Sequence, residues 1–421
     1  MNRHPLPWRA SPHAVRLATV ALLATAAAIV PARPEPLVIA VPPLVLLAAA
    51  RRPAISELDV EWRLTTERCF EGEEVELHAI VRAAGRLDAL TLTLDPGAVE
   101  LVSHRAASAP DGSWAEGVWT VRAQRWGRRA VGAITVTALA AGRTRRARLT
   151  LNVDELGVFP DPGTARAAIA PAELLARLGD HTSRAVGTAV EFAGVRPYTA
   201  GDRPRRINWP VSSRRGELHV NQQSAERAAD VVVLLDALSE TGPPGDTTLD
   251  RVVRGTAAVV RAQLRRADRV GVVALGSRIR WLGPDLGERH FYRIVETVLD
   301  VWDARGYRRP DVTRIPPPAL PPGALVLVFS PLLDPDAIEV IRDLRERGFT
   351  TVVVDVLREE PPVRSGDRMA RLALRMWRLD RAALLAWLAG LGIPVLTWDG
   401  TSSLDTALAS LDRRALLPRH S

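Results

Sequence analysis

Two apolar segments without a charged residue lie near the start of the chain. They are Leu17–Val30 and Leu37–Ala50, and a proline-rich turn separates them. A helix of about fourteen residues spans only about 21 Å, whereas the hydrocarbon core of a membrane is about 30 Å thick, so each segment needs flanking residues to cross it. The pattern predicts a membrane hairpin within residues 1–52, with transmembrane segments at about 14–32 and 34–50.

The charges around these segments predict their orientation. Arginines precede the first segment and Arg51 and Arg52 follow the second, so the positive-inside rule places both outer flanks, and the bulk of the chain, in the cytoplasm. A secretory signal peptide is an alternative, since Arg3 and Arg9 stand before a short apolar stretch. A buried hairpin of a soluble protein is another, and in every helical interpretation Pro42–Pro43 kinks the second segment.

Residues 53–160 alternate between apolar and polar positions in short runs that are rich in β-branched residues. Turn signals such as Asp95–Gly97 separate the runs. About six or seven strands at this spacing predict an antiparallel β-sandwich of immunoglobulin-like type, a scaffold or binding module. His78 and His104 have no second ligand at metal-binding spacing. The clearest runs are Val75–Val81, Leu90–Leu94, Trp119–Val121, Ala133–Thr137 and Ala147–Leu151.

Residues 230–421 follow a different pattern, in which continuous apolar runs alternate with amphipathic helical stripes. Such runs are typical of strands buried on both faces, and the alternation predicts a doubly wound parallel sheet, an α/β fold. One predicted helix begins at Pro335 after the N-cap Asp334 and ends at Gly348, and others lie near 381–391 and 402–416. The predicted strands are Val231–Leu235, Val270–Leu275, Leu325–Phe329, Thr350–Val356 and Ile393–Leu396.

The composition excludes several classes of function. The chain has 421 residues, of which 47% are hydrophobic and 25% charged, as in globular proteins of about two or three domains. Its one cysteine, Cys69, excludes an internal disulfide and a cysteine-ligated zinc or iron–sulfur centre. All 56 basic residues are arginine, which excludes a P-loop ATPase and a Schiff-base enzyme, because both need a lysine.

The net charge of +8 is concentrated at the start of the chain. Residues 1–52 hold six arginines against one acid, Glu35, so they carry +5 and the remaining residues carry only +3. The later arginines are mixed with acids and no nucleic-acid-binding motif is present, so nucleic acid is not expected as a partner. The local run Arg203–Arg206 could still bind an acidic group.

No catalytic set is apparent in the sequence. Ligands of doubly wound sheets bind beyond the carboxyl ends of the strands, and Asp236 ends the first predicted core strand, so it would lie at such a site. No glycine-rich dinucleotide motif, nucleophile elbow or H-E-x-x-H motif is present. The histidines are scattered, and His181, His219 and His290 are interpreted as ordinary surface or core residues. We therefore expect no enzyme activity, no cofactor and no small-molecule substrate.

Residues 191–236 resemble the signature of the domain of unknown function 58 (DUF58) family, a bacterial family of von Willebrand factor type A-like proteins. Asn208 replaces an aspartate of the family pattern. The order of two membrane segments, a β-rich region, a signature segment at 161–229 and an α/β domain at 230–421 also agrees with the family. The matching residues are Arg196, Tyr198, Gly201, Asp202, Arg206, Ile207 and Trp209, followed by Ser213, Arg214, Gly216 and Leu218.

The signature is interpreted as a latch that ties its segment to the α/β domain, in preference to a ligand site. Asp202 within reach of Arg205 or Arg206 would form a charge-assisted pair. Trp209 would anchor the loop by burial.

The resemblance also implies the fold of von Willebrand type A domains, many of which carry a metal-ion-dependent adhesion site. That site needs a D-x-S-x-S element, a threonine and a further aspartate, which supply oxygen ligands for Mg²⁺. Here Leu238 and Glu240 stand where the two serines belong, and Pro331 stands where the further aspartate belongs. Thr247 or Thr248 could supply the threonine. We expect no bound metal, with Asp236 as the remnant of a degenerate site.

The resemblance implies a membrane-anchored, non-catalytic interaction or adaptor protein that works with a MoxR-type AAA+ ATPase. One alternative is a metal-dependent adhesion receptor exposed outside the cell, and another is a hydrolase with an unrecognised site around Asp202 and Arg206. The oligomeric state is left open.

Overall fold

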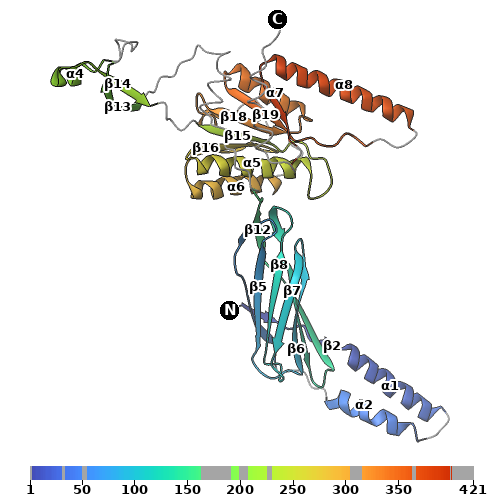
Figure 1. Cartoon of the computed structure of the whole chain (residues 1–421). Helices are drawn as coiled ribbons and strands as arrows, with labels where there is room; N and C mark the ends of the chain where they lie inside the picture. Colours follow the sequence, from blue (N-terminus) through green and yellow to red (C-terminus); the bar gives the residue numbers. More distant parts are fainter. Residues whose placement is uncertain are drawn as a thin grey trace. The chain divides into compact units, whose positions relative to one another are not determined.

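The chain divides into two compact units, Met1–Pro160 and Asp161–Ser421 (Figure 1). The structure is a computed structural model. It describes residues 2–30, 34–49, 55–162, 191–198, 207–224, 230–303, 315–362, 367–398 and 400.

A pair of apolar helices, α1 (Pro12–Ile29) and α2 (Leu37–Ala49), lies side by side in the first unit. Ser11 caps α1, since its hydroxyl accepts a hydrogen bond from the Ala14 amide at 3.1 Å. In the described part of the chain, α1 is the one helix long and apolar enough to cross a membrane, and α2 is a shorter apolar helix. Alanines face the pair's interior while leucine, valine and isoleucine side chains point outward. The buried alanines are Ala14, Ala21, Ala24, Ala28 and Ala40.

Two short strands precede α1 and belong to the β-rich region. Strand β1 (Asn2–Pro5) pairs antiparallel with β3 (Glu57–Leu64), and β2 (Arg9–Ala10) pairs with β11 (Arg145–Asn152). The indole Nε1 of Trp8 donates to the carbonyl of Ile55 at 2.7 Å. The sequence pattern assigned residues 1–52 as a whole to the membrane hairpin. The structure instead joins the first ten residues to the sheets, because strands of four and two residues are too short to produce an alternating pattern.

The rest of the first unit consists of sheets around one apolar core, in which the strands pair antiparallel except for the parallel pair β4 and β12. Strands such as β5 and β8 alternate between buried and more exposed positions, because one face of the sheet packs on the core, whereas the edge strand β7 is exposed throughout. A five-stranded sheet has the order β1-β3-β5-β8-β7, a four-stranded sheet the order β2-β11-β10-β6, and a small third sheet the order β4-β12-β9. The bounds are β4 (Arg68–Phe70), β5 (Glu74–Ala83), β6 (Ala89–Pro96), β7 (Glu100–Ser108), β8 (Trp114–Arg122), β9 (Gly127–Ala130), β10 (Gly132–Ala140) and β12 (Glu155–Phe159).

The second unit contains a six-stranded sheet with the order β17-β16-β15-β18-β19-β20. It is parallel except for β17, an antiparallel edge strand that the sequence pattern did not indicate. Helices cover both faces, with α5 and α6 on one and α7 and α8 on the other (Figure 1). The elements are β15 (Val231–Asp236), α5 (Thr248–Arg265), β16 (Val270–Leu275), β17 (Arg280–Asp285), α6 (Glu288–Asp303), β18 (Leu325–Ser330), α7 (Pro335–Glu346), β19 (Thr350–Asp355), α8 (Arg368–Gly390) and β20 (Val395–Thr397).

The described part of the signature segment forms a hairpin with a short helix. Strands β13 (Glu191–Pro197) and β14 (His219–Ser224) pair antiparallel, and α4 (Trp209–Arg215) stands between them in the chain. Asn208, which replaces the aspartate of the family pattern, accepts a hydrogen bond from the Val211 amide at 3.2 Å. Both residue types are good N-caps, so the substitution preserves the start of this helix.

Candidate functional site

The carboxyl edge of the parallel sheet is where the sequence placed a site, and Asp236 is buried there at the end of β15. Its Oδ2 accepts a hydrogen bond from the Ser330 hydroxyl at 2.6 Å, and its Oδ1 accepts one from the Leu238 amide at 3.0 Å. The Ser330 hydroxyl also accepts a hydrogen bond from the Leu332 amide at 2.9 Å. The ends of β15 and β18 are therefore joined by side chains that bond to each other.

Burial raises the pKa of Asp236 to about 6, because the ionised carboxylate is less stable away from water. The hydrogen bonds from Ser330 and Leu238 lower the pKa and the nearby charge of Asp334 raises it, but the effect of burial is the largest. The carboxyl group thus changes protonation close to neutral pH.

The residues at the adhesion-site positions are engaged in capping α5. The side chain of Thr247 accepts a hydrogen bond from the Asp250 amide at 3.2 Å, and Asp250 Oδ2 accepts one from the Thr247 amide at 3.0 Å, which together form a capping box. The Thr247 hydroxyl lies 2.9 Å from Glu240 Oε1, and the Thr248 hydroxyl accepts from the Thr241 amide at 3.1 Å. Among the described residues, no group of three or more histidine, cysteine, aspartate or glutamate side chains could hold a metal ion.

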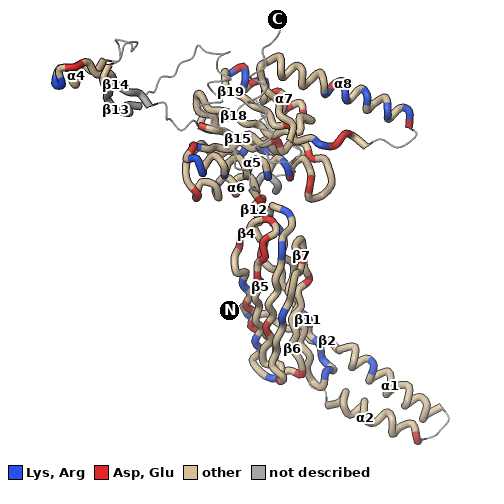
Figure 2. Tube along the Cα trace, viewed as in Figure 1, with Lys and Arg blue, Asp and Glu red and all other residues tan. Residues whose placement is uncertain are grey.

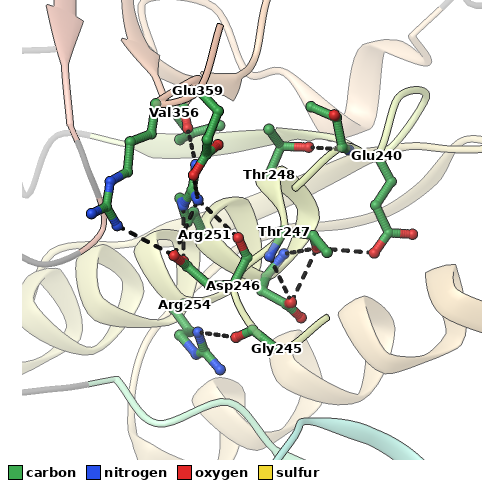
Figure 3. A network of polar contacts seen from close by, with 12 residues as sticks. Glu240, Gly245, Asp246, Thr247, Thr248, Arg251, Arg254, Val356 and Glu359 are labelled. Atoms are coloured by element: carbon green, nitrogen blue, oxygen red, sulfur yellow. Dashed lines mark hydrogen bonds and ion pairs between the residues drawn. The ribbon is translucent and has the colours of Figure 1, made fainter. Parts of the chain in front are cut away.

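Arg251, near the start of α5, is at the centre of a polar network beside this edge (Figure 3). Its side chain is 1% exposed, and its guanidinium holds two carboxylates. Nε donates to Asp246 Oδ1 at 2.9 Å, Nη2 donates to Glu359 Oε1 at 2.6 Å, and Nη1 donates to the carbonyl of Val356 at 3.2 Å. The network joins the loop after β15 to the loop after β19.

Charge and hydrogen bonding support each other in this network. Burial lowers the pKa of Arg251, but the hydrogen bonds with Glu359 and Asp246 and their charges outweigh it and raise that pKa above its ordinary value. The hydrogen bond from Arg251 likewise holds the pKa of Glu359 below its ordinary value. Arg358 reaches Asp246 at 3.4 Å from a half-exposed position. The ion pairs are therefore formed at neutral pH.

A second ion pair closes the end of β19. Arg381 Nη2, on α8, donates to Asp355 Oδ2 at 2.5 Å, and its Nη1 donates to the carbonyl of Pro331 at 3.0 Å. Asp355 Oδ1 accepts from the Leu357 amide at 3.0 Å. Burial raises the pKa of Asp355, and the charge of Arg381 opposes that shift without cancelling it.

Three neighbouring strands thus end in acidic or hydroxyl side chains whose hydrogen-bonding groups contact the protein itself. The acids belong to ion pairs or buried hydrogen bonds, and the Ser330 hydroxyl that donates to the Asp236 carboxylate is itself fully buried. The buried polar side chains at the ends of these strands are therefore bonded within the domain.

The signature residues are only partly within the described structure. Gly201, Asp202 and Arg206 lie outside the described residues, and so does the proposed pairing of Asp202 with Arg205 or Arg206. Arg196 lies on β13, and the Tyr198 amide donates to the carbonyl of Leu218 at 2.8 Å, which closes the hairpin.

Trp209 does not anchor its loop by burial, because its side chain is 65% exposed at the first position of α4. Burial of Trp209 was expected because tryptophan side chains are highly buried on average. The start of this helix is instead fixed by the cap of Asn208.

Sequence reasoning missed the arginine network. Arg251, Glu359, Asp355 and Arg381 belong to no motif, and their partners lie far apart in the chain. No local pattern marks Arg251, because it stands beside Asp250 like an ordinary charged residue on a helix, and its burial appears only in the folded chain.

Comparison with known proteins finds a family match over part of this chain. Residues 194–363 match the model of the family described as protein of unknown function DUF58. That range includes the end of β13, the helix α4 and the strands β14 to β19, with Asp236, Arg251 and Glu359. Uncharacterised proteins of Mycobacterium bovis and of two strains of Mycobacterium tuberculosis are each 26% identical to this chain over 182 residues, which are 42% of this chain. The chain spans about half the length (51%) of these curated relatives.

Proposed function

We propose that this chain is a membrane-anchored, non-catalytic docking protein whose α/β domain presents the carboxyl edge of its sheet to a protein partner. The observation that carries the proposal is the bonding of the buried polar groups at this edge to each other, as in Asp236 with Ser330 and Asp355 with Arg381. A fully bonded polar network is rigid, and rigidity lowers the entropy lost when a partner binds.

The resemblance to DUF58 proteins favours a MoxR-type AAA+ ATPase as the partner. An exposed loop between β15 and α5 supports docking at this edge. It contains Glu240, Thr241, Gly242, Pro243 and Pro244, and its exposed prolines restrict the backbone. Such a loop offers a partner a surface that needs little ordering.

The partner is tested by purifying the full chain from its native membranes in a mild detergent. We expect an AAA+ ATPase to co-purify with the wild type, and Pro244→Glu to lower the recovered ATPase by about tenfold, as for a substitution at an interface centre. Arg265→Gln is the matched control, since it makes the same change of charge at the opposite end of α5. Wild-type protein that never retains an ATPase, or two variants with equal recovery, would contradict the proposal.

The strands before α1 support a helical hairpin in the membrane. Strands β1 and β2 precede α1 in the chain, and β3 follows α2, yet all three belong to the sheets of one unit. A folded unit lies on one side of a membrane, so α1 and α2 must enter and leave on that side. Removal of α1 as a leader, with the residues before it, would also take two strands from the sheets.

Thiol labelling tests this topology, because the natural Cys69 is buried. With a membrane-impermeant maleimide on intact cells, we expect Glu35→Cys, in the turn between the helices, to be labelled. Pro7→Cys and Arg86→Cys, which lie before α1 and in the β-rich region, should react only after the cells are opened. Labelling of Arg86→Cys from outside would favour the adhesion receptor. Labelling of Pro7→Cys and Arg86→Cys from opposite sides would contradict the hairpin.

A further inference from the structure

Helix α8 has a face that the fold does not use. Of its 23 residues only Leu388 is buried. The second half attaches to the domain, since Leu384 and Leu385 pack against the sheet core and Arg381 bonds Asp355. The first half extends away from the strands of its own unit (Figure 1).

One exposed sector of α8 is apolar. Met369, Leu372, Met376 and Leu379 are spaced by three, four and three residues, so they lie along one side of the helix. Their exposed fractions are 73%, 48%, 65% and 64%. Trp387, 41% exposed, continues this sector toward the end of the helix. These side chains are separate from the inward face, so packing among the residues that the structure describes does not account for them.

A basic sector lies directly beside the apolar one. Arg368, Arg371, Arg375 and Arg378 each precede one of the four apolar residues, so the two sectors have the same spacing and are offset by one residue, about 100° around the helix. Figure 2 shows the basic positions repeating along α8. Arg378 pairs with Glu360, whereas the other three arginines make no ion pair with any residue that the structure describes.

We propose that the first half of α8 binds an anionic membrane surface, with its arginines on lipid phosphates and its methionines and leucines at the boundary between headgroups and acyl chains. A helix with an exposed apolar sector beside a row of arginines fits such an interface, because the apolar side chains can contact acyl chains while the arginines contact phosphates. The long arginine side chains can reach the phosphates while the helix lies in the surface plane.

A lipid surface fits these observations better than an acidic groove on a protein. The same chain has a helix long and apolar enough to enter a membrane, so a membrane would be close to α8 at high effective concentration. In this respect the inference rests on the proposed anchoring. The association of α8 with lipid is a second contact and is measured separately.

The test uses the full chain with Leu372→Cys carrying an environment-sensitive dye, in vesicles of phosphatidylcholine alone or with about one quarter phosphatidylglycerol. Flotation with either vesicle reports anchoring. We expect the dye emission to move to shorter wavelength only with phosphatidylglycerol. The same dye at Leu286→Cys, a leucine that is 47% exposed just before α6 on the other face of the sheet, should show no such shift.

Three arginine substitutions separate charge from apolar contact. Arg368→Gln, Arg371→Gln and Arg375→Gln together should remove the shift, and circular dichroism should show that the helix content is unchanged. Three exposed arginines elsewhere in the unit provide a control with equal charge change, Arg265→Gln, Arg266→Gln and Arg342→Gln, which should keep it. Protein that floats without a dye shift, or a shift independent of these arginines, overturns the inference. A shift that occurs in detergent when a co-purified protein is added would assign the surface to a protein groove, and also overturns it.

Discussion

Replacing Arg251 by alanine is expected to lower the free energy of unfolding of the second unit by about 3–5 kcal/mol. The guanidinium is 1% exposed and holds both Asp246 and Glu359. Without it, two carboxylates face each other beside the buried end of α5, and the carbonyl of Val356 loses a donor. Arg251→Lys should recover only part of the loss, because an ammonium cannot reproduce the planar fork that contacts both acids.

The measurement is amide hydrogen exchange in the full chain. It is read at the amides of β15 and β19, whose exchange is expected to require unfolding of the second unit. Arg358→Ala is the control, since Arg358 pairs with the same Asp246 from a half-exposed position and should contribute less than about 1 kcal/mol. Equal losses of unfolding free energy for Arg251→Ala and Arg358→Ala would show that the buried network does not stabilise the contact between the loops after β15 and β19.

The second large effect is a pH-dependent gain of stability on replacing Asp236 by asparagine. An unfolded aspartate ionises near pH 4, whereas Asp236 in the folded chain has a pKa of about 6. Between these values the folded chain holds a proton that the unfolded chain has lost, so stability falls as the pH rises through this window. The full loss, present above the folded pKa, is about 3 kcal/mol.

Asp236→Asn removes this loss and keeps an oxygen that can accept from the Leu238 amide. We expect the variant and the wild type to be similar near pH 4, and the variant to be more stable by about 3 kcal/mol at pH 7. Hydrogen exchange of the β15 amides, measured for both proteins at pH 4 and at pH 7, gives the difference in unfolding free energy between the variant and the wild type. Other titrating groups contribute equally to both proteins, so they do not affect this difference. Asp380→Asn, the same substitution at an exposed position on α8, is the matched control for the change of residue type. A variant less stable than the wild type at pH 7 would indicate that the carboxylate is held by stronger interactions than those with Ser330 and Leu238.

The sequence predicted the elements whose pattern is local. The continuous apolar runs correspond to β15, β16, β18 and β19, and the helix expected after Asp334 is α7, in which Asp334 accepts a hydrogen bond from the Asp336 amide at 2.8 Å. It did not indicate β1, β2 or β17, because two to six residues at a sheet edge carry little periodicity. Helix α8 begins at residue 368, earlier than the expected 381, since its first half lacks the buried stripe on which the expectation rested. The helix expected near 402–416 lies outside the described residues.

At the candidate site, too, the sequence predicted what depends on local pattern and missed what depends on distant pairs. The place of Asp236 followed from the end of a strand, and its poor agreement with an adhesion site followed from Leu238 and Pro331. The bonds that hold the edge together join residues far apart in the chain, since 94 positions separate Asp236 from Ser330, 108 separate Arg251 from Glu359, and 26 separate Asp355 from Arg381. One sequence without related sequences gives no signal for such pairs, since each residue alone has the pattern of an ordinary charged position.

The early strands also constrain the order in which the protein can be assembled during synthesis. Ala10 pairs with Arg145, so β2 has no partner until the ribosome has translated most of the first unit. The apolar helices emerge long before that partner does. Under the proposed anchoring, insertion of these helices into the bilayer would therefore precede closure of the four-stranded sheet.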